Sequence, residues 1–199
     1  MSQTIPRSPL RGALWPLLAA LVLLTAARCA QREVEPPCAC PGPAKVLDQE
    51  LMVRLASARA LHHQADLHLQ QGEVELAIKT VRRILALDLD PRWPEAEEAQ
   101  LDARARLAKL LLGQAKEGDA LEAVEQGISG ARRPSFYLSN LHSVRGEVLE
   151  QRAKRLDGEG DKPGARQAAR AAIAAFESSI TINKELQRQL LRENEQKGK

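Results

Sequence analysis

Three histidines stand close together in one segment, and imidazole is a common ligand for transition metals. His62, His63 and His68 are separated by one, five and six residues. Helical zinc sites instead place two histidines four residues apart, on one face of the helix. The spacing found here spreads the three rings around a helix. We therefore interpret them as exposed side chains near a groove, and we predict neither a metal nor a cofactor.

Two other segments contain residue types that could serve catalysis. The stretch 158–164 has the glycines of a phosphate-binding loop, but it lacks the Gly-Lys-Ser/Thr ending, and Pro163 removes an N–H that would hold phosphate. His142 and Ser143 are adjacent, yet they do not lie in the turn that presents a hydrolase nucleophile. Nothing marks an acid that would complete such a site. We expect a protein without catalytic activity, with a small envelope hydrolase as the distant alternative.

The first 28 residues have the pattern of an export signal. Arg7 and Arg11 give a positive start, and an uncharged apolar run of about 14 residues follows, short of the roughly 20 that a membrane span needs. The exit, 24–29, resembles a bacterial lipobox, although Arg28 stands where a small residue is usual. That resemblance implies that Cys29 is lipidated and becomes the mature N-terminus. Cleavage after Ala27, giving a soluble exported protein, and an uncleaved anchor are the alternatives.

The segment 29–44 is expected to be a tether. Four prolines within it favour an extended chain that spaces the body from its anchor. A disulfide between Cys38 and Cys40 would close a small, strained ring, and two thiols are too few for zinc, so we interpret them as inert. Ala30 replaces the aspartate that in related lipoproteins favours the inner membrane. We therefore expect the periplasmic face of the outer membrane, with a soluble periplasmic or secreted protein as the alternative.

The charge of the chain belongs mainly to this leader. It contains three arginines and no acid, so its removal takes the formal net charge from +3 to 0. A neutral body lacks the basic surface by which proteins bind nucleic acid, and we predict no nucleic-acid partner.

The body of the chain is expected to be all-α. It is rich in Ala, Leu, Arg, Glu and Gln, which lose little side-chain freedom in a helix. Apolar residues recur at helical spacing, and Pro94 suits the first turn of a helix. The predicted domain covers 45–185, and a charged helical tail that frays covers 186–199. The expected helices are about 45–71, 73–88, 94–116, 119–131, 135–156 and a sixth after a mobile loop at 157–164.

Two Gly-acid pairs predict turns between consecutive helices. Gly72 precedes Glu73 and Gly118 precedes Asp119. Glycine accepts the left-handed backbone at a helix end, and an acid suits the positive start of the next helix. The six helices would thus form three hairpins, each with an apolar face that only a neighbouring hairpin can cover.

These hairpins resemble the tetratricopeptide repeat (TPR) family over roughly 58–183. The residues that carry the resemblance are Ala65, Gly72, Glu73, Ala77, Ile78 and Val81 in the first hairpin, Leu107, Leu110, Gly118, Asp119, Ala123 and Val124 in the second, and Gly146, Ala172, Ile173 and Phe176 in the third. The two glycines lie 46 residues apart (118 − 72), whereas the family repeats every 34. The aromatic residues of the family motif are mostly aliphatic here. The resemblance implies a short stack of hairpins that binds proteins.

The resemblance also implies a groove lined by the first helix of each hairpin. The matching positions are Arg59, His62, Asp66 and Gln70 in the first hairpin and Ala105, Ala108, Leu112 and Lys116 in the second. One arginine beside an acid does not make a clamp for a peptide carboxylate, and we favour a polar groove around Leu112. The predicted function is a membrane-tethered, non-catalytic adaptor of the bacterial envelope. A structural protein that self-associates through the amphipathic helix 173–191 is the alternative.

Overall fold

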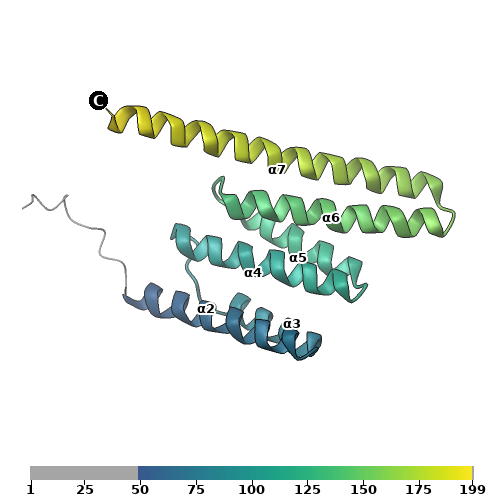
Figure 1. Ribbon diagram of the computed structural model, residues 1–199, viewed down its shortest axis with the longest axis horizontal. Coiled ribbons are helices and arrows are strands. Elements are labelled where there is room, and N and C mark those ends of the chain that lie inside the picture. The colour runs from purple at the N-terminus through teal and green to yellow at the C-terminus, as the bar shows by residue number, and fades with distance from the viewer. Residues whose placement is uncertain (1–48, 199) are drawn as a thin grey trace, which may run out of the picture. The chain divides into compact units, whose positions relative to one another are not determined.

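The computed structural model describes residues 49–198, and these are helical with no strand among them. Their six helices confirm the all-α prediction (Figure 1). The bounds are α2 (Gln49–Gln70), α3 (Val74–Leu85), α4 (Pro94–Gly113), α5 (Glu117–Gly130), α6 (Phe136–Gly158) and α7 (Lys162–Lys197). None of these helices combines the length and the apolarity needed to cross a bilayer. The predicted leader, Cys29, Cys38, Cys40 and the tether 29–44 lie outside the described residues.

The helices pair in chain order. α2 packs on α3, α4 on α5 and α6 on α7, and the pairs are linked because α4 also contacts α3 and α2, while α6 also contacts α5 and α4. The first helices of the three hairpins therefore follow one another in one layer, α2, α4, α6 (Figure 1). Within the part of the chain that the structure describes, α7 contacts α6 alone.

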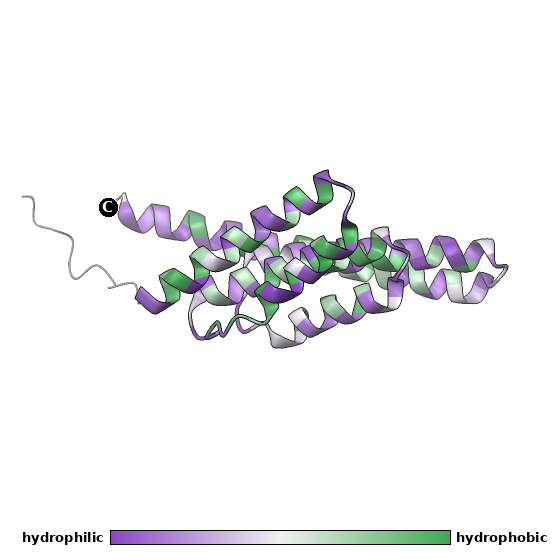
Figure 2. Cartoon of the chain, turned by 90° about the horizontal axis from the view of Figure 1, so that it is seen from below, coloured by the Kyte–Doolittle hydropathy of each residue, from purple (hydrophilic) through white to green (hydrophobic). Residues whose placement is uncertain are grey.

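One apolar core runs from α2 to α6. Ile78 and Ile84 of α3, Leu111 of α4 and Val124 of α5 are almost completely buried within it, as is Leu141 of α6. Figure 2 shows the hydrophobic residues gathered between helices and hydrophilic residues on the outer surfaces. A core shared in this way supports the view that the hairpins stabilise one another.

The three hairpin turns have the same backbone geometry. Gly72, Ala115 and Gly160 have φ values of 77°, 56° and 86°, in the left-handed region. In each turn the next residue donates its N–H to the carbonyl five residues earlier, over 2.8, 3.0 and 2.9 Å, which is the Schellman arrangement of a helix end. The left-handed residues are 43 and 45 residues apart (115 − 72 and 160 − 115). The same type of turn therefore joins the two helices of each of the three hairpins.

Small residues recur around these turns. An alanine stands seven residues before each left-handed residue and another stands five residues after it. The pairs are Ala65 and Ala77, Ala108 and Ala120, and Ala153 and Ala165. All are buried except Ala153, which is half-buried. Because alanine has only a methyl group, two helices can approach closely on both sides of a short turn.

The second turn corrects the prediction for Gly118. That glycine lies in the first turn of α5, and Ala115 occupies the left-handed position instead. With the turn at this position, both Ala108 and Ala120 are completely buried, which favours placement of the turn by packing. Gly72, in contrast, stands where the sequence predicts it.

Ala115→Gly is expected to stabilise the protein by about 1 kcal/mol, because a left-handed alanine is strained and glycine is not. The reverse change at the equivalent position, Gly72→Ala, should destabilise by a similar amount. Urea unfolding followed by circular dichroism measures both. A lower stability for Ala115→Gly would show that the turn carries no strain.

A further prediction is corrected at the third hairpin. The expected mobile loop 157–164 is a connection of three residues, because α6 continues to Gly158 and α7 begins at Lys162. The Asp161 carboxylate accepts a hydrogen bond from the Gly164 N–H at 2.9 Å and so caps α7, with Pro163 in the first turn. The predicted tail is part of α7, which is continuous to Lys197.

Candidate functional site

Polar side chains meet across the layer formed by α2, α4 and α6. On α4, Asp102, Arg106 and Lys109 share one face, because residues three and four apart are neighbours on a helix. They face partners on the flanking helices. We call the set the charged seam, and its members are His62, Asp66, Asp102, Arg106, Lys109 and Glu147.

Arg106 is the centre of the seam between α2 and α4. Its Nη2 forms an ion pair with Asp66, and its Nη1 donates to the Nδ1 of His62 at 3.2 Å and to the His62 carbonyl at 3.3 Å. The other ring nitrogen of His62, Nε2, lies 3.5 Å from a carboxylate oxygen of Asp102. Since a guanidinium only donates, Nδ1 must accept, and the proton of the neutral ring lies on Nε2 toward Asp102.

This environment keeps His62 neutral. Burial lowers the pKa of its imidazole, and the positive charge of Arg106 lowers it further, while Asp102 and Asp66 act in the opposite direction. The neighbouring His63 also lowers it. A protonated ring would place an N–H against the Arg106 N–H, so the hydrogen bond from Arg106 to His62 Nδ1 requires the neutral form.

Lowering the pH below 6.5, the ordinary pKa of histidine, is expected to reduce stability through His62. The unfolded chain then binds a proton that the folded chain does not, so the free energy of unfolding falls until the pH reaches the lower folded pKa. Urea unfolding at pH 7.5 and pH 5 measures this loss. His62→Gln should make the stability less dependent on pH.

His142 provides the comparison for this experiment. Burial also lowers the pKa of its imidazole, but it lies on α6, outside the seam. His142→Gln should therefore remove a separate part of the pH dependence, and the two variants should act additively. An unchanged pH dependence in His62→Gln would contradict the assignment to His62.

A shallow cavity of about 480 Å³ adjoins the seam between α4 and α6. The Lys109 ammonium lies 3.6 Å from a carboxylate oxygen of Glu147 beside it. The lining residues are Lys109, Leu112, Gly113, Ala115, Glu117, Glu147 and Gln151. One leucine among polar groups suits an apolar side chain of a bound peptide, with hydrogen bonds at the edge.

The structure brings together some of the predicted groove residues. His62 and Asp66 belong to the charged seam, and Leu112 lines the cavity. Arg59 and Gln70 are exposed on α2. Lys116 instead turns toward α3, where its ammonium lies 2.8 Å from Glu75.

Ala105 and Ala108, by contrast, are buried and line no groove, so this part of the prediction is wrong. The second turn lies three residues earlier than predicted, which accounts for Ala108. Ala105 remains the equivalent of His62 when counted back from Ala115, and it is buried there. Counting back from Ala115, the positions equivalent to Arg59 and Asp66 are Asp102 and Lys109. The repeated alanine pairs are the signal in the sequence that locates these residues.

The three neighbouring histidines have separate surroundings. His62 faces α4, whereas the Nδ1 of His68 lies 2.7 Å from the Glu73 carboxylate. His63 is exposed. Across the described helices, no three histidine, cysteine or acidic side chains gather closely enough to hold a metal ion.

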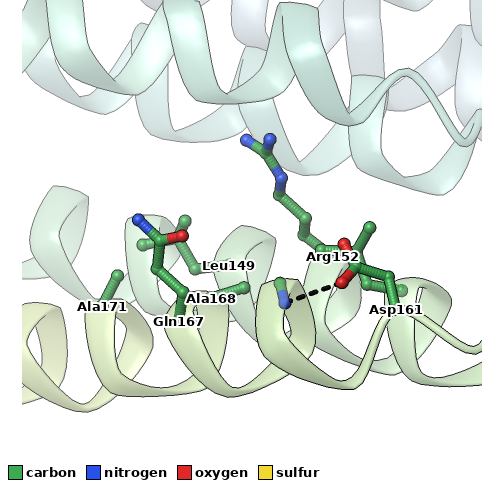
Figure 3. Close-up of a pocket in the computed structure, with 8 residues that line it drawn as sticks. Leu149, Arg152, Asp161, Gln167, Ala168 and Ala171 are labelled. Carbon is green, nitrogen blue, oxygen red and sulfur yellow. Dashed lines mark hydrogen bonds between the residues drawn. The ribbon is translucent and has the colours of Figure 1, made fainter.

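A second cavity, of about 330 Å³, lies between α6 and α7 near their connection (Figure 3). Leu149 and Ala168 contribute apolar surface, and Asp161 is used as the cap of α7. Figure 3 shows the Arg152 side chain extending away from α7. These groups form a crevice without a convergent set of polar atoms.

No model of a known protein family matches this sequence, and a search of the curated proteins finds no similar one.

Proposed function

We propose that the chain is a non-catalytic scaffold whose three TPR-like hairpins stack in series and bind proteins. The threefold repeated turn, with an alanine pair around each turn that is buried except at Ala153, carries the proposal. A hairpin that contacts only its neighbours is the unit of repeat proteins, and such arrays use extended surfaces for binding. The contacts of α4 with α2 and α6 support the same arrangement.

The surface proposed for the partner is the charged seam with the cavity beside Leu112. Its charges are paired between helices, so the positive groups of Arg106 and Lys109 are already neutralised by Asp66 and Glu147. A partner would therefore be recognised through shape and hydrogen bonds, with an apolar side chain against Leu112. Recognition of a free carboxylate, which needs uncompensated cations, is not favoured.

The expected location completes the proposal. An export leader and lipid on Cys29 would attach the scaffold to an envelope membrane, on the periplasmic face of the outer membrane, and the tether 29–44 would space it from the bilayer. The intact mass of membrane-extracted protein tests this part. A mass beginning at an acylated Cys29 supports it, whereas a mass beginning at Arg28 means soluble export.

A pair of matched leucine variants tests the scaffold. Leu112→Glu places a charge in the cavity, and Leu76→Glu makes the same change at an exposed site on α3. Proteins crosslinked in intact cells and recovered with the chain should be lost in Leu112→Glu and kept in Leu76→Glu. Recovery of the same proteins with both variants would reject this surface, and recovery of no reproducible partner would count against the scaffold.

A further inference from the structure

The outer face of α7 is the face that points away from α6. The equivalent faces of α3 and α5 are covered by the next helix along the chain. Nine residues after each left-handed residue stand Val81 of α3, Val124 of α5 and Ala169 of α7. Both valines are fully buried, since α4 packs on α3 and α6 packs on α5. Ala169 is exposed, because α6 is the only described helix that contacts α7. The repeat itself therefore indicates that a helix fits this face.

Apolar residues extend this face along the helix. Ile173, Ile180 and Leu191 are 58%, 52% and 56% exposed. With Ala169 they lie within roughly 40° of one another at 3.6 residues per turn. We call these four residues the outer stripe. Figure 1 shows α7 continuing past the start of α6.

We propose that a second copy of the chain covers the outer stripe, with the two α7 helices antiparallel about a two-fold axis at Ile180. In this register Leu191 of one copy opposes Ala169 of the other, because both lie eleven residues from the centre. A large residue then packs over a small one at each end. Ile180 meets its own symmetry mate in the middle.

In the same register, charged residues beside the outer stripe of one copy face residues of opposite charge on the other copy. Glu177 and Lys184 lie three and four residues from the centre on opposite sides, so each faces the other across the pair. Arg166 and Glu195, at fourteen and fifteen residues, do the same. Because of the two-fold axis, each of these two ion pairs occurs twice in the dimer. None of these four side chains has an ion-pair partner among the described residues, whereas the adjacent Glu185 binds Arg188 and Arg192.

This self-complementarity selects a second copy over an unrelated helix. A symmetric interface requires that one surface carry both members of each pair, and the outer stripe does. The helices would be in contact over about 33 Å, from Ala169 to Leu191. An interface of one helix pair is at the small end of stable interfaces, so we expect a dissociation constant on the order of micromolar.

Sedimentation equilibrium of the purified full chain in density-matched detergent tests the dimer. The wild type should show a monomer–dimer equilibrium. Ile180→Glu places two carboxylates at the axis and should weaken association at least about 10-fold. Leu67→Glu, the same type of change at an exposed position of α2, should leave association unchanged. A wild type that is monomeric at about 100 times the expected micromolar constant overturns the proposal.

A charge exchange tests the register. Glu177→Lys alone should weaken the dimer by about 3- to 10-fold, and adding Lys184→Glu should restore it. Residues seven apart can pair within α7, as Glu185 and Arg192 do, but Glu177 and Lys184 form no such pair among the described contacts, so restoration is expected to come from the second copy. Circular dichroism checks that the variants fold. A dimer that is insensitive to Ile180→Glu, or is not restored by the double exchange, overturns this interface.

The experiment is independent of the scaffold proposal. It uses the purified chain without any partner protein, and it changes residues far in sequence from Leu112. A monomeric result would leave binding at the charged seam unaffected, and failure to find a partner would leave the dimer unaffected.

Discussion

Glu97→Leu is expected to lower the free energy of unfolding by about 3 kcal/mol, the largest effect we predict for one residue. The Glu97 carboxylate is 4% exposed and accepts two hydrogen bonds, from the Arg132 N–H at 2.7 Å and the Arg133 Nε at 2.8 Å. Leucine would leave both donors without their acceptor. Glu97→Gln keeps the size and one acceptor, so about half of the loss is expected.

The effect is large because the Glu97 carboxylate helps to fix two loops, the one before α4 and the one before α6. Arg133, once fixed by Glu97, donates through Nη2 to the carbonyls of Pro91 and Arg92 at 3.1 and 3.2 Å. The loop before α4 and the loop before α6 are thereby joined. Their relative position sets how the hairpins follow one another, and hence the shape of the charged seam.

Urea unfolding of the Glu97 variants measures this effect. Glu95→Gln is the matched control, since it changes an exposed acid in the same helical turn and should alter stability by less than about 0.5 kcal/mol. Combining Glu97→Leu with Arg133→Leu should cost less than the sum of the single changes. A Glu97→Leu protein within about 0.5 kcal/mol of the wild type would show that the carboxylate holds neither loop.

Gly146→Ala is expected to lower stability by about 2 kcal/mol, although alanine is intrinsically the better helix former. A methyl group at Gly146 would lie 2.6 Å from both Cε1 and Cζ of the Phe176 ring. Real Cβ atoms do not approach so closely, so the Phe176 ring would have to leave its position or α6 and α7 would have to move apart. The contacts at risk include the buried hydroxyls of Ser139 and Ser179, which lie 2.9 Å from each other.

A second substitution should relieve this collision. Phe176→Leu removes the two ring atoms nearest the new methyl group, so the double variant should be less destabilised than the sum of the singles. Gly118→Ala is the control. A Cβ there meets nothing within 4 Å, so alanine should raise the stability of α5 by up to about 1 kcal/mol. An unchanged stability for Gly146→Ala would contradict the close packing of α6 and α7.

Features with a local cause could be predicted from the sequence alone. The helices follow from composition and apolar spacing, which act within a few turns of one chain segment. Gly72 marks a helix end because its backbone freedom is a property of the residue, and Pro94 marks a helix start for the same kind of reason. His62 and Asp66 could be selected as surface residues by their positions relative to the first turn, whereas Leu112 is selected by counting from Gly118, three residues beyond the left-handed Ala115.

The remaining features depend on which helices pack together, and no local signal specifies that. Ala115 adopts a left-handed backbone that alanine does not favour, because the burial of Ala108 and Ala120 requires a turn between them. The partners of His62 lie about 40 residues away on α4, so its neutral state is set by an inter-helix contact. Sequence determined the helices and one turn, whereas tertiary packing decided the register that assembles the seam, since burial is a property of the assembled helices.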